Sequence, residues 1–76
     1  MNDKRRKLLR EALEHLELAA GLVMDVSMEE QMAHDNLPEQ FQYNEQGEKM
    51  DEAIANLEEA GGLIDEASQL ISSASE

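Results

Sequence analysis

The sequence predicts an all-α protein: an antiparallel helical hairpin with a coiled-coil-like core of alternating large and alanine side chains. Two observations predict this fold. Apolar residues recur at heptad spacing in both halves of the chain, and the only proline lies between the halves. We expect one domain, residues 1–76, with a first helix at about 3–35, a turn at about 36–44 and a second helix at about 45–73. We also expect the hairpin to associate as a homo-oligomer, with a dimer that forms a four-helix bundle as the simplest arrangement.

The first predicted helix carries its core candidates at alternating steps of three and four residues, which is the period of a supercoiled helix and not of a strand. These positions are Leu9, Ala12, Leu16, Ala19, Val23, Val26, Glu30 and Ala33. The second predicted helix repeats the spacing at Met50, Ala53, Leu57, Ala60, Ile64, Ala67, Ile71 and Ala74. Each helix therefore has one narrow apolar seam that can pack against the other helix.

The two helices also resemble each other in sequence, because "LELAAGLVMDVS" at 16–27 aligns with "LEEAGGLIDEAS" at 57–68 in the same heptad register. The antiparallel register that follows opposes Leu16 with Ala67, Ala19 with Ile64, Val23 with Ala60, Val26 with Leu57, and Ala33 with Met50. Nearly every layer pairs a large side chain with an alanine. Such layers fill space evenly and let the helices approach closely.

The stretch "HDNLPEQFQYNEQ", residues 34–46, is the expected turn. Proline lacks an N–H and disfavours α geometry in the residue before it, so residues 36–38 should end the first helix. We expect Pro38 to begin a short helical turn that runs through Phe41, and Asn44 to cap the second helix. Gly47 fits this interpretation less well, because a glycine inside a helix costs about 1 kcal/mol.

The aromatic residues of the turn have two interpretations. Leu37, Phe41 and Tyr43 form either an apolar plug over the end of the hairpin or a recognition tip for a partner. We expect Phe41 to be part of the plug and Tyr43 to lie on the surface, since its hydroxyl group needs water or a polar partner.

One hairpin cannot bury all the apolar residues of the first helix, which is apolar almost all round between residues 18 and 28. A second stripe points away from the seam, and glycines stand at equivalent repeat positions, Gly21 and Gly62. Asp25 is the only charge in this zone and would be costly to bury unpaired, so it lies at a dimer edge or binds something at the two-fold axis. The candidate oligomer interface is Leu18, Gly21, Leu22, Asp25, Met28, Met32 and Leu63.

The charge distribution limits the partners of the protein. The net charge is −12, but five of the six basic residues stand between Lys4 and Arg10. The acidic remainder of the chain repels nucleic acid and suits a basic protein surface, or it forms solvated helix faces. The basic cluster "KRRK", residues 4–7, opposes the helix dipole, so it either lies beside the C-terminal end of the second helix or contacts an anionic partner.

No catalytic, cofactor or metal-binding motif occurs in the sequence. There is no cysteine, so thiolate chemistry and disulfides are excluded. His15 and His34 lack the preceding acid of the Glu-x-x-His motif, because Ala12 and Gln31 occupy those positions. No run of about 18 apolar residues is present, and Glu11 with its following acids interrupts any signal peptide. We expect a soluble, cytoplasmic protein that is not an enzyme.

The stretch "MEEQMAHDNLPEQFQYNEQGEKMDEAIANLEEA", residues 28–60, resembles small acidic helical-hairpin proteins encoded by bacteriophages and prophages. The marks are 29–31, 35–39 and 47–50, followed by a helix rich in Glu and Ala. The resemblance implies the cytoplasm of a bacterial host and a role as an inhibitor of host defence or regulatory proteins. The architecture is also similar to the plasmid repressor-of-primer protein, a dimeric hairpin that binds RNA loops, although this chain has basic residues only at one end.

Three functions are consistent with these features. The first is a non-enzymatic inhibitor that docks an acidic helical surface on a basic host protein. The second is an oligomeric sponge that holds an anionic small molecule or nucleotide between subunits, through Arg5, Arg6 and Lys7 together with Phe41 or Tyr43. The third is an RNA-binding hairpin, which the acidic charge disfavours, and no membrane partner is expected.

Overall fold

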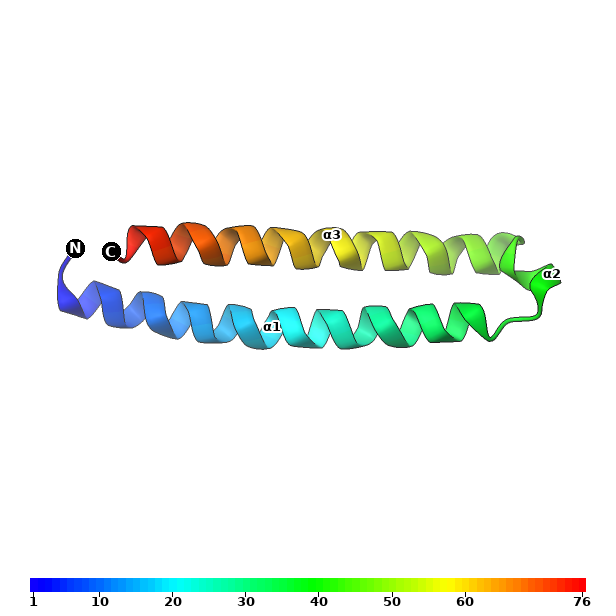
Figure 1. Ribbon diagram of the computed structural model, residues 1–76, viewed down its shortest axis with the longest axis horizontal. Coiled ribbons are helices and arrows are strands. Elements are labelled where there is room, and N and C mark those ends of the chain that lie inside the picture. The colour runs from blue at the N-terminus through cyan, green and yellow to red at the C-terminus, as the bar shows by residue number, and fades with distance from the viewer.

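The computed structural model describes all residues, 1–76, and contains three helices. They are α1 (Asp3–Asp35), α2 (Glu39–Gln42) and α3 (Glu45–Ala74). Helices α1 and α3 run antiparallel side by side, α2 closes one end, and both chain termini lie at the other end (Figure 1). The predicted all-α helical hairpin is confirmed.

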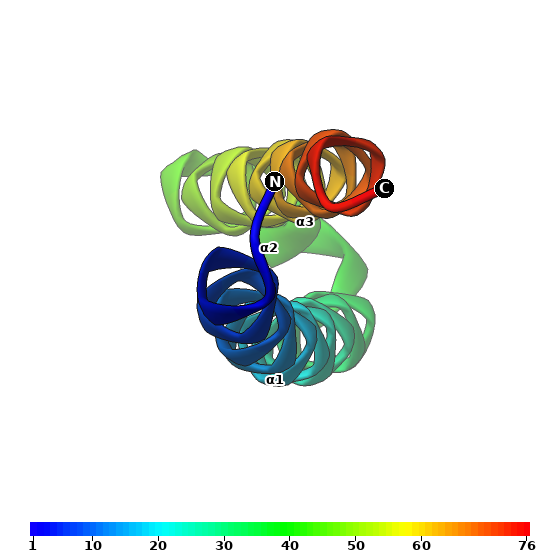
Figure 2. The same cartoon turned by 90° about the vertical axis from the view of Figure 1, so that its left-hand side faces the viewer.

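The long helices cross at a shallow angle. Viewed from the end that holds the termini, α1 and α3 drift in opposite directions as they recede (Figure 2). The hairpin is a rod with extents of 58 × 14 × 12 Å, and no part of it forms a strand.

Helix α1 begins and ends at asparagine residues. The side chain of Asn2 accepts a hydrogen bond from the Arg5 backbone N–H at 2.9 Å, which satisfies one of the free amides of the first turn. At the other end, the Asn36 backbone N–H still donates to the Met32 carbonyl at 3.0 Å. The chain then leaves the helix just before Pro38, as predicted.

The connection is held by backbone and amide hydrogen bonds. Pro38 lies just outside α2 and not inside it, so the short helix begins one residue later than expected. The Phe41 N–H donates to the Pro38 carbonyl at 2.8 Å, and the Gln42 side-chain amide donates to the Leu37 carbonyl at 2.9 Å. These two bonds satisfy carbonyl groups that follow the end of α1.

Helix α3 begins with the predicted cap. The Asn44 side-chain oxygen accepts hydrogen bonds from the backbone N–H groups of Gln46 at 3.0 Å and Gly47 at 3.2 Å. Gly47 is buried, and a Cβ at this position would collide with the Gln42 carbonyl group and lie 2.7 Å from the Phe41 carbonyl oxygen. Gly47 is therefore required by the close approach of the connection, and the interpretation of it as a misfit is wrong.

The seam of α1 departs from the heptad prediction in its second half. Val26 is 50% exposed and Ala33 is also exposed, whereas Ser27 and His34 are half-buried in their place. The positions one residue later are half-buried along the whole of α1, at Leu13, Ala20, Ser27 and His34, and they keep heptad spacing. In α3 the same holds for Gly61, Ser68 and Ser75, and Ile54 is more buried than the predicted Ala53 directly before it. The seam therefore keeps the 3.5-residue period, and the sequence prediction placed one of its two heptad positions one residue too early.

The hairpin by itself has almost no core. Only Gly47 and Ile54 are buried, and Ile54, at 6% exposure, is the one buried apolar side chain. The predicted seam positions that do face the other helix are half-buried, because two helices leave the flanks of every layer open. A thin core of this kind rarely stabilises so short a chain without further association.

The solvent-exposed area of the chain also shows how little surface the hairpin buries. The chain exposes 5895 Å², whereas a compact folded chain of this size exposes about 4,650 Å². Its radius of gyration is 17.2 Å, whereas about 11 Å is typical of a globular domain of this length. The excess of about 1,200 Å² is similar to the area that one subunit buries in an obligate dimer.

Candidate interaction surfaces

The exposed apolar side chains are the main candidates for a functional surface. The large ones are Met1, Leu8, Leu18, Leu22, Met24, Val26, Met28, Met32, Phe41, Tyr43, Leu63 and Leu70. Single exposed apolar residues are ordinary, but sets that share one helix face mark binding sites. Apart from residues at the ends and in the connection, most of these side chains fall on two faces of the rod.

The first surface lies along one side of the hairpin, and we call it the Ala/Leu face. It consists of Leu8, Ala12, His15, Ala19, Leu22 and Val26 on α1 and of Ala60, Leu63, Ala67, Leu70 and Ala74 on α3. Both sets recur at steps of three and four residues, so each lies on one side of its helix. No acidic residue is among them, and His15 is the only titratable side chain.

A groove near the connection shows that the two halves of the Ala/Leu face lie on the same side. Glu30 of α1 and Lys49 of α3 line this groove together. Val26 stands one helical turn before Glu30, and Leu63 and Leu70 stand two and three heptads after Lys49. The Ala/Leu face therefore continues the Glu30–Lys49 side of the hairpin toward the chain termini.

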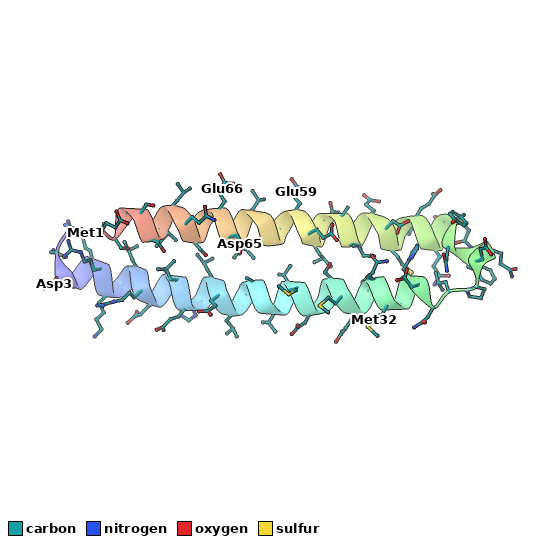
Figure 3. The ribbon with its side chains drawn as sticks, in the orientation of Figure 1. Met1, Asp3, Met32, Glu59, Asp65 and Glu66 are labelled. Atoms are coloured by element: carbon teal, nitrogen blue, oxygen red, sulfur yellow. The ribbon has the colours of Figure 1, made fainter.

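The second surface is the outer stripe of α1, which we define as Leu18, Gly21, Leu22, Asp25, Met28 and Met32. Asp25 stands two residues from both Val23 and Ser27, which face α3, so its side chain leaves the helix on the opposite side. Figure 3 shows Met32 pointing away from α3. All six residues are exposed, and a Cβ on Gly21 would meet nothing within 4 Å.

The third surface is the outer face of α3, which is acidic. Glu48, Glu52, Glu59 and Glu66 stand there at helical spacing, with Ala55 and Gly62 between them, and all are exposed. Figure 3 shows Glu59 and Glu66 pointing away from α1. None of these four glutamates belongs to an ion pair. Their charges are therefore free to attract a basic partner.

The basic cluster lies at the end of the rod that holds the chain termini. The Arg6 guanidinium donates to the Ser75 carbonyl oxygen at 3.1 Å and pairs with Asp3 at 3.3 Å. For Arg6 this confirms the predicted position beside the C-terminal end of the second helix. Arg5 and Lys7 are exposed and make no ion pair, so they remain free for an anionic group.

The turn aromatics occupy the opposite end of the rod from the basic cluster (Figure 1). Phe41 is 41% exposed and Tyr43 is 78% exposed, so Phe41 covers the end of the hairpin only in part, while Tyr43 stands on the surface as expected. Within one chain, Arg5, Arg6 and Lys7 therefore cannot share a ligand with these aromatics. A second copy running in the opposite direction would be needed to bring the two groups together.

His34 makes a contact between the helices that sequence reasoning missed. Its side chain is 13% exposed, with Nδ1 3.3 Å from Asp35 Oδ1 and Nε2 3.2 Å from Asp51 Oδ1 on α3. The contact with Asp51 is close but not aligned as a hydrogen bond, so it acts as an ion pair when the imidazole is protonated. Position 34 continues the heptad series of Leu13, Ala20 and Ser27, which are also half-buried, but a histidine at such a position gives no apolar signal.

Few other features of the structure could bind a metal ion or a ligand. No group of three His, Asp or Glu side chains is placed to hold a metal ion. A shallow groove on the side opposite the Ala/Leu face is lined by Ala20, Met24, Met28, Gly61, Gly62 and Asp65, among others, and it is open to solvent. No helix in the structure has an apolar run long enough to cross a membrane.

Comparison with known protein families, with curated proteins and with solved structures finds no match to this chain.

Proposed function

We propose that the chain is a non-enzymatic interaction protein that acts as a homodimer and docks its acidic outer α3 face on a basic surface of a bacterial host protein. The resemblance to small phage proteins suggests inhibition of a host defence or regulatory protein as the biological role. The observation that carries the proposal is the single buried apolar side chain, Ile54, in a chain of 76 residues. A hairpin with so little core needs a second surface in order to be stable.

The Ala/Leu face suits a second copy of the same chain. Its alanines allow close helix approach and its leucines fill the layers between them, which is how antiparallel helices pack in four-helix bundles. None of its residues is acidic, and Glu59 and Glu66 stand one turn from Leu63 at its edge, so two copies, each with a net charge of −12, would meet with carboxylates beside the contact and not within it. Of the interface residues expected from sequence, Leu22 and Leu63 lie on this face and the other five lie only on the outer stripe of α1.

Dimerisation through the Ala/Leu face leaves the acidic face exposed on both subunits. Only four of the eighteen acidic residues take part in ion pairs: Asp3, Asp35, Glu45 and Asp51. The dimer would carry one row of glutamates without ion-pair partners on each subunit. Such a surface is complementary to a protein surface that is rich in Lys and Arg. The sponge and the RNA-binding hairpin are the alternatives, and neither has a surface assembled within one chain.

The dimer is tested by sedimentation equilibrium at tens of micromolar. The wild type should be dimeric, and the double variant Leu63→Glu, Leu70→Glu should be monomeric, because four carboxylates would enter one desolvated face. The matched control is Ala55→Glu, Ser73→Glu, which adds the same charge on the outer side of α3 and should remain dimeric. A monomeric wild type, or equal dissociation of both variants, would disprove this interface.

The docking function is tested by native mass spectrometry of protein purified from bacterial cells. We expect a co-purifying host protein with the wild type, and its loss from a variant in which Glu48, Glu52, Glu59 and Glu66 are all changed to glutamine. A small-molecule adduct would support the sponge instead, and bound nucleic acid would support the RNA-binding hairpin.

A further inference from the structure

We infer that the outer stripe of α1 is a docking site for an amphipathic helix that carries a lysine or arginine at the centre of its apolar face. This inference rests on the proposed function, because it names the kind of partner segment that the interaction protein binds at a second surface. The inference rests on the position of the Asp25 carboxylate in the middle of an exposed apolar stripe, with the exposed Glu29 one turn further along the same side of α1.

The stripe has the dimensions of a helix-binding surface. It runs from Leu18 to Met32, which is about 21 Å along the axis of α1, or four turns. Leu18, Leu22, Met28 and Met32 are all more than half exposed in the single hairpin, and Leu22 stands at the edge that the stripe shares with the Ala/Leu face. Methionine adapts its shape to different partners, and Gly21, with open space around it, lets a partner backbone approach closely.

Asp25 determines the charge of the occupant. The residues one turn away on α1 are Gly21, Leu22, Met28 and Glu29, so no basic side chain of α1 is placed to neutralise its carboxylate. Asp25 also faces away from α3, so no residue of that helix can reach it. An apolar helix without a charge would bury this carboxylate unpaired, which is costly, whereas a helix with a central Lys or Arg would pair with it.

A second copy of the chain is a poor occupant of the same stripe. Leu18 and Met32 each stand seven residues from Asp25, and Leu22 and Met28 each stand three residues from it. A two-fold packing that matches these apolar side chains places the two Asp25 carboxylates face to face. Like charges in a desolvated seam repel, so self-association favours the Ala/Leu face.

The test uses two designed helical peptides of about 18 residues, enough to span the stripe. Each carries leucine three and seven residues before and after its centre, with lysine at the centre of one and glutamate at the centre of the other. Isothermal titration calorimetry with the full chain should give binding of the lysine peptide. Affinity for the glutamate peptide should be weaker by about tenfold or more.

A charge reversal separates this site from general attraction to an acidic protein. Asp25→Lys should lose affinity for the lysine peptide by about tenfold or more and gain affinity for the glutamate peptide. The matched control is Glu39→Lys in the connection, which changes the net charge equally and should leave both affinities unchanged. Equal effects of the two variants would overturn the proposal.

Two further outcomes would also overturn it. One is a rapid disulfide between copies of the Asp25→Cys variant, which would show that a second copy occupies the stripe. The other is failure of the wild type to bind either peptide while it remains a dimer in sedimentation. The second result would refute the stripe as a docking site and leave the proposed dimer intact.

Discussion

Gly47 shows how one residue ties the connection to α3. Its missing side chain leaves room for the carbonyl groups of Phe41 and Gln42, and its N–H donates to the Asn44 side chain. Two constraints therefore meet at one position: a helix cap and a close backbone approach. Gly21, Gly61 and Gly62 are different, because a Cβ at any of them would meet nothing within 4 Å.

Alanine usually gives a more stable helix than glycine, but at position 47 we expect the opposite. We expect Gly47→Ala to lower the free energy of unfolding by about 1–3 kcal/mol, because the new methyl group collides with backbone that cannot move freely. Gly62→Ala, in an open helix interior, should raise it by about 1 kcal/mol. Urea denaturation followed by far-UV circular dichroism, at one fixed protein concentration, measures both. A stabilised Gly47→Ala variant would mean that the connection is looser than described.

At the scale of the elements, the pairing of α1 with α3 depends on small residues in the seam. Ala60 is half-buried on α3, and the sequence-based register opposes it with Val23 of α1. The contact of His34 with Asp51 joins residues directly after Ala33 and Met50, which the same register opposes. Ala55, by contrast, is exposed on the outer side of α3.

Enlarging these two alanines should therefore have unequal effects. Ala60→Leu should overpack its layer and lower the free energy of unfolding by about 1–3 kcal/mol. Ala55→Leu should leave stability nearly unchanged, since the new side chain projects into solvent. Thermal and urea unfolding of the two variants at matched concentration gives the comparison. Similar losses for both would show that the predicted register is incorrect.

At the scale of the whole molecule, the balance between an apolar surface and a large negative charge governs association. The rod exposes about 1,200 Å² more than a compact chain would, and it carries a net charge of −12. Burial of apolar surface favours a dimer, whereas repulsion between two such charges opposes it. Added salt screens the repulsion and leaves the apolar burial in place.

The proposed dimer should therefore become tighter by several-fold between about 20 mM and about 500 mM sodium chloride. Binding to a basic partner should change in the opposite direction, because salt screens attraction too. Sedimentation equilibrium at the two salt concentrations measures the first effect, with the Leu63→Glu, Leu70→Glu variant as a control that stays monomeric. A dimer that weakens in high salt would indicate that ion pairs, for instance from Arg5 or Lys7, hold the copies together.

The sequence by itself determined the helical hairpin, the end of α1 before Pro38 and the cap of α3 at Asn44, because these are set by local chemistry. Heptad spacing specifies helices, Pro38 stops α1, and the side chain of Asn44 caps α3. The position of Arg6 beside the end of α3 also followed from the antiparallel arrangement. The candidate apolar residues of α1 could be named in the same way, because a helix with apolar residues all round cannot be covered by one neighbour.

Only the tertiary structure decided which residues fill the seam and which faces remain open. Packing of α1 on α3 placed Ser27 and His34 in the seam instead of Val26 and Ala33, and it buried Ile54 more deeply than Ala53. Ser27 and His34 are polar, so the apolar pattern of the sequence gives no sign of this choice. The packing also separated the predicted interface into the Ala/Leu face and the outer stripe centred on Asp25. That separation depends on where α3 lies around α1, which is a property of the packed pair and not of either helix alone.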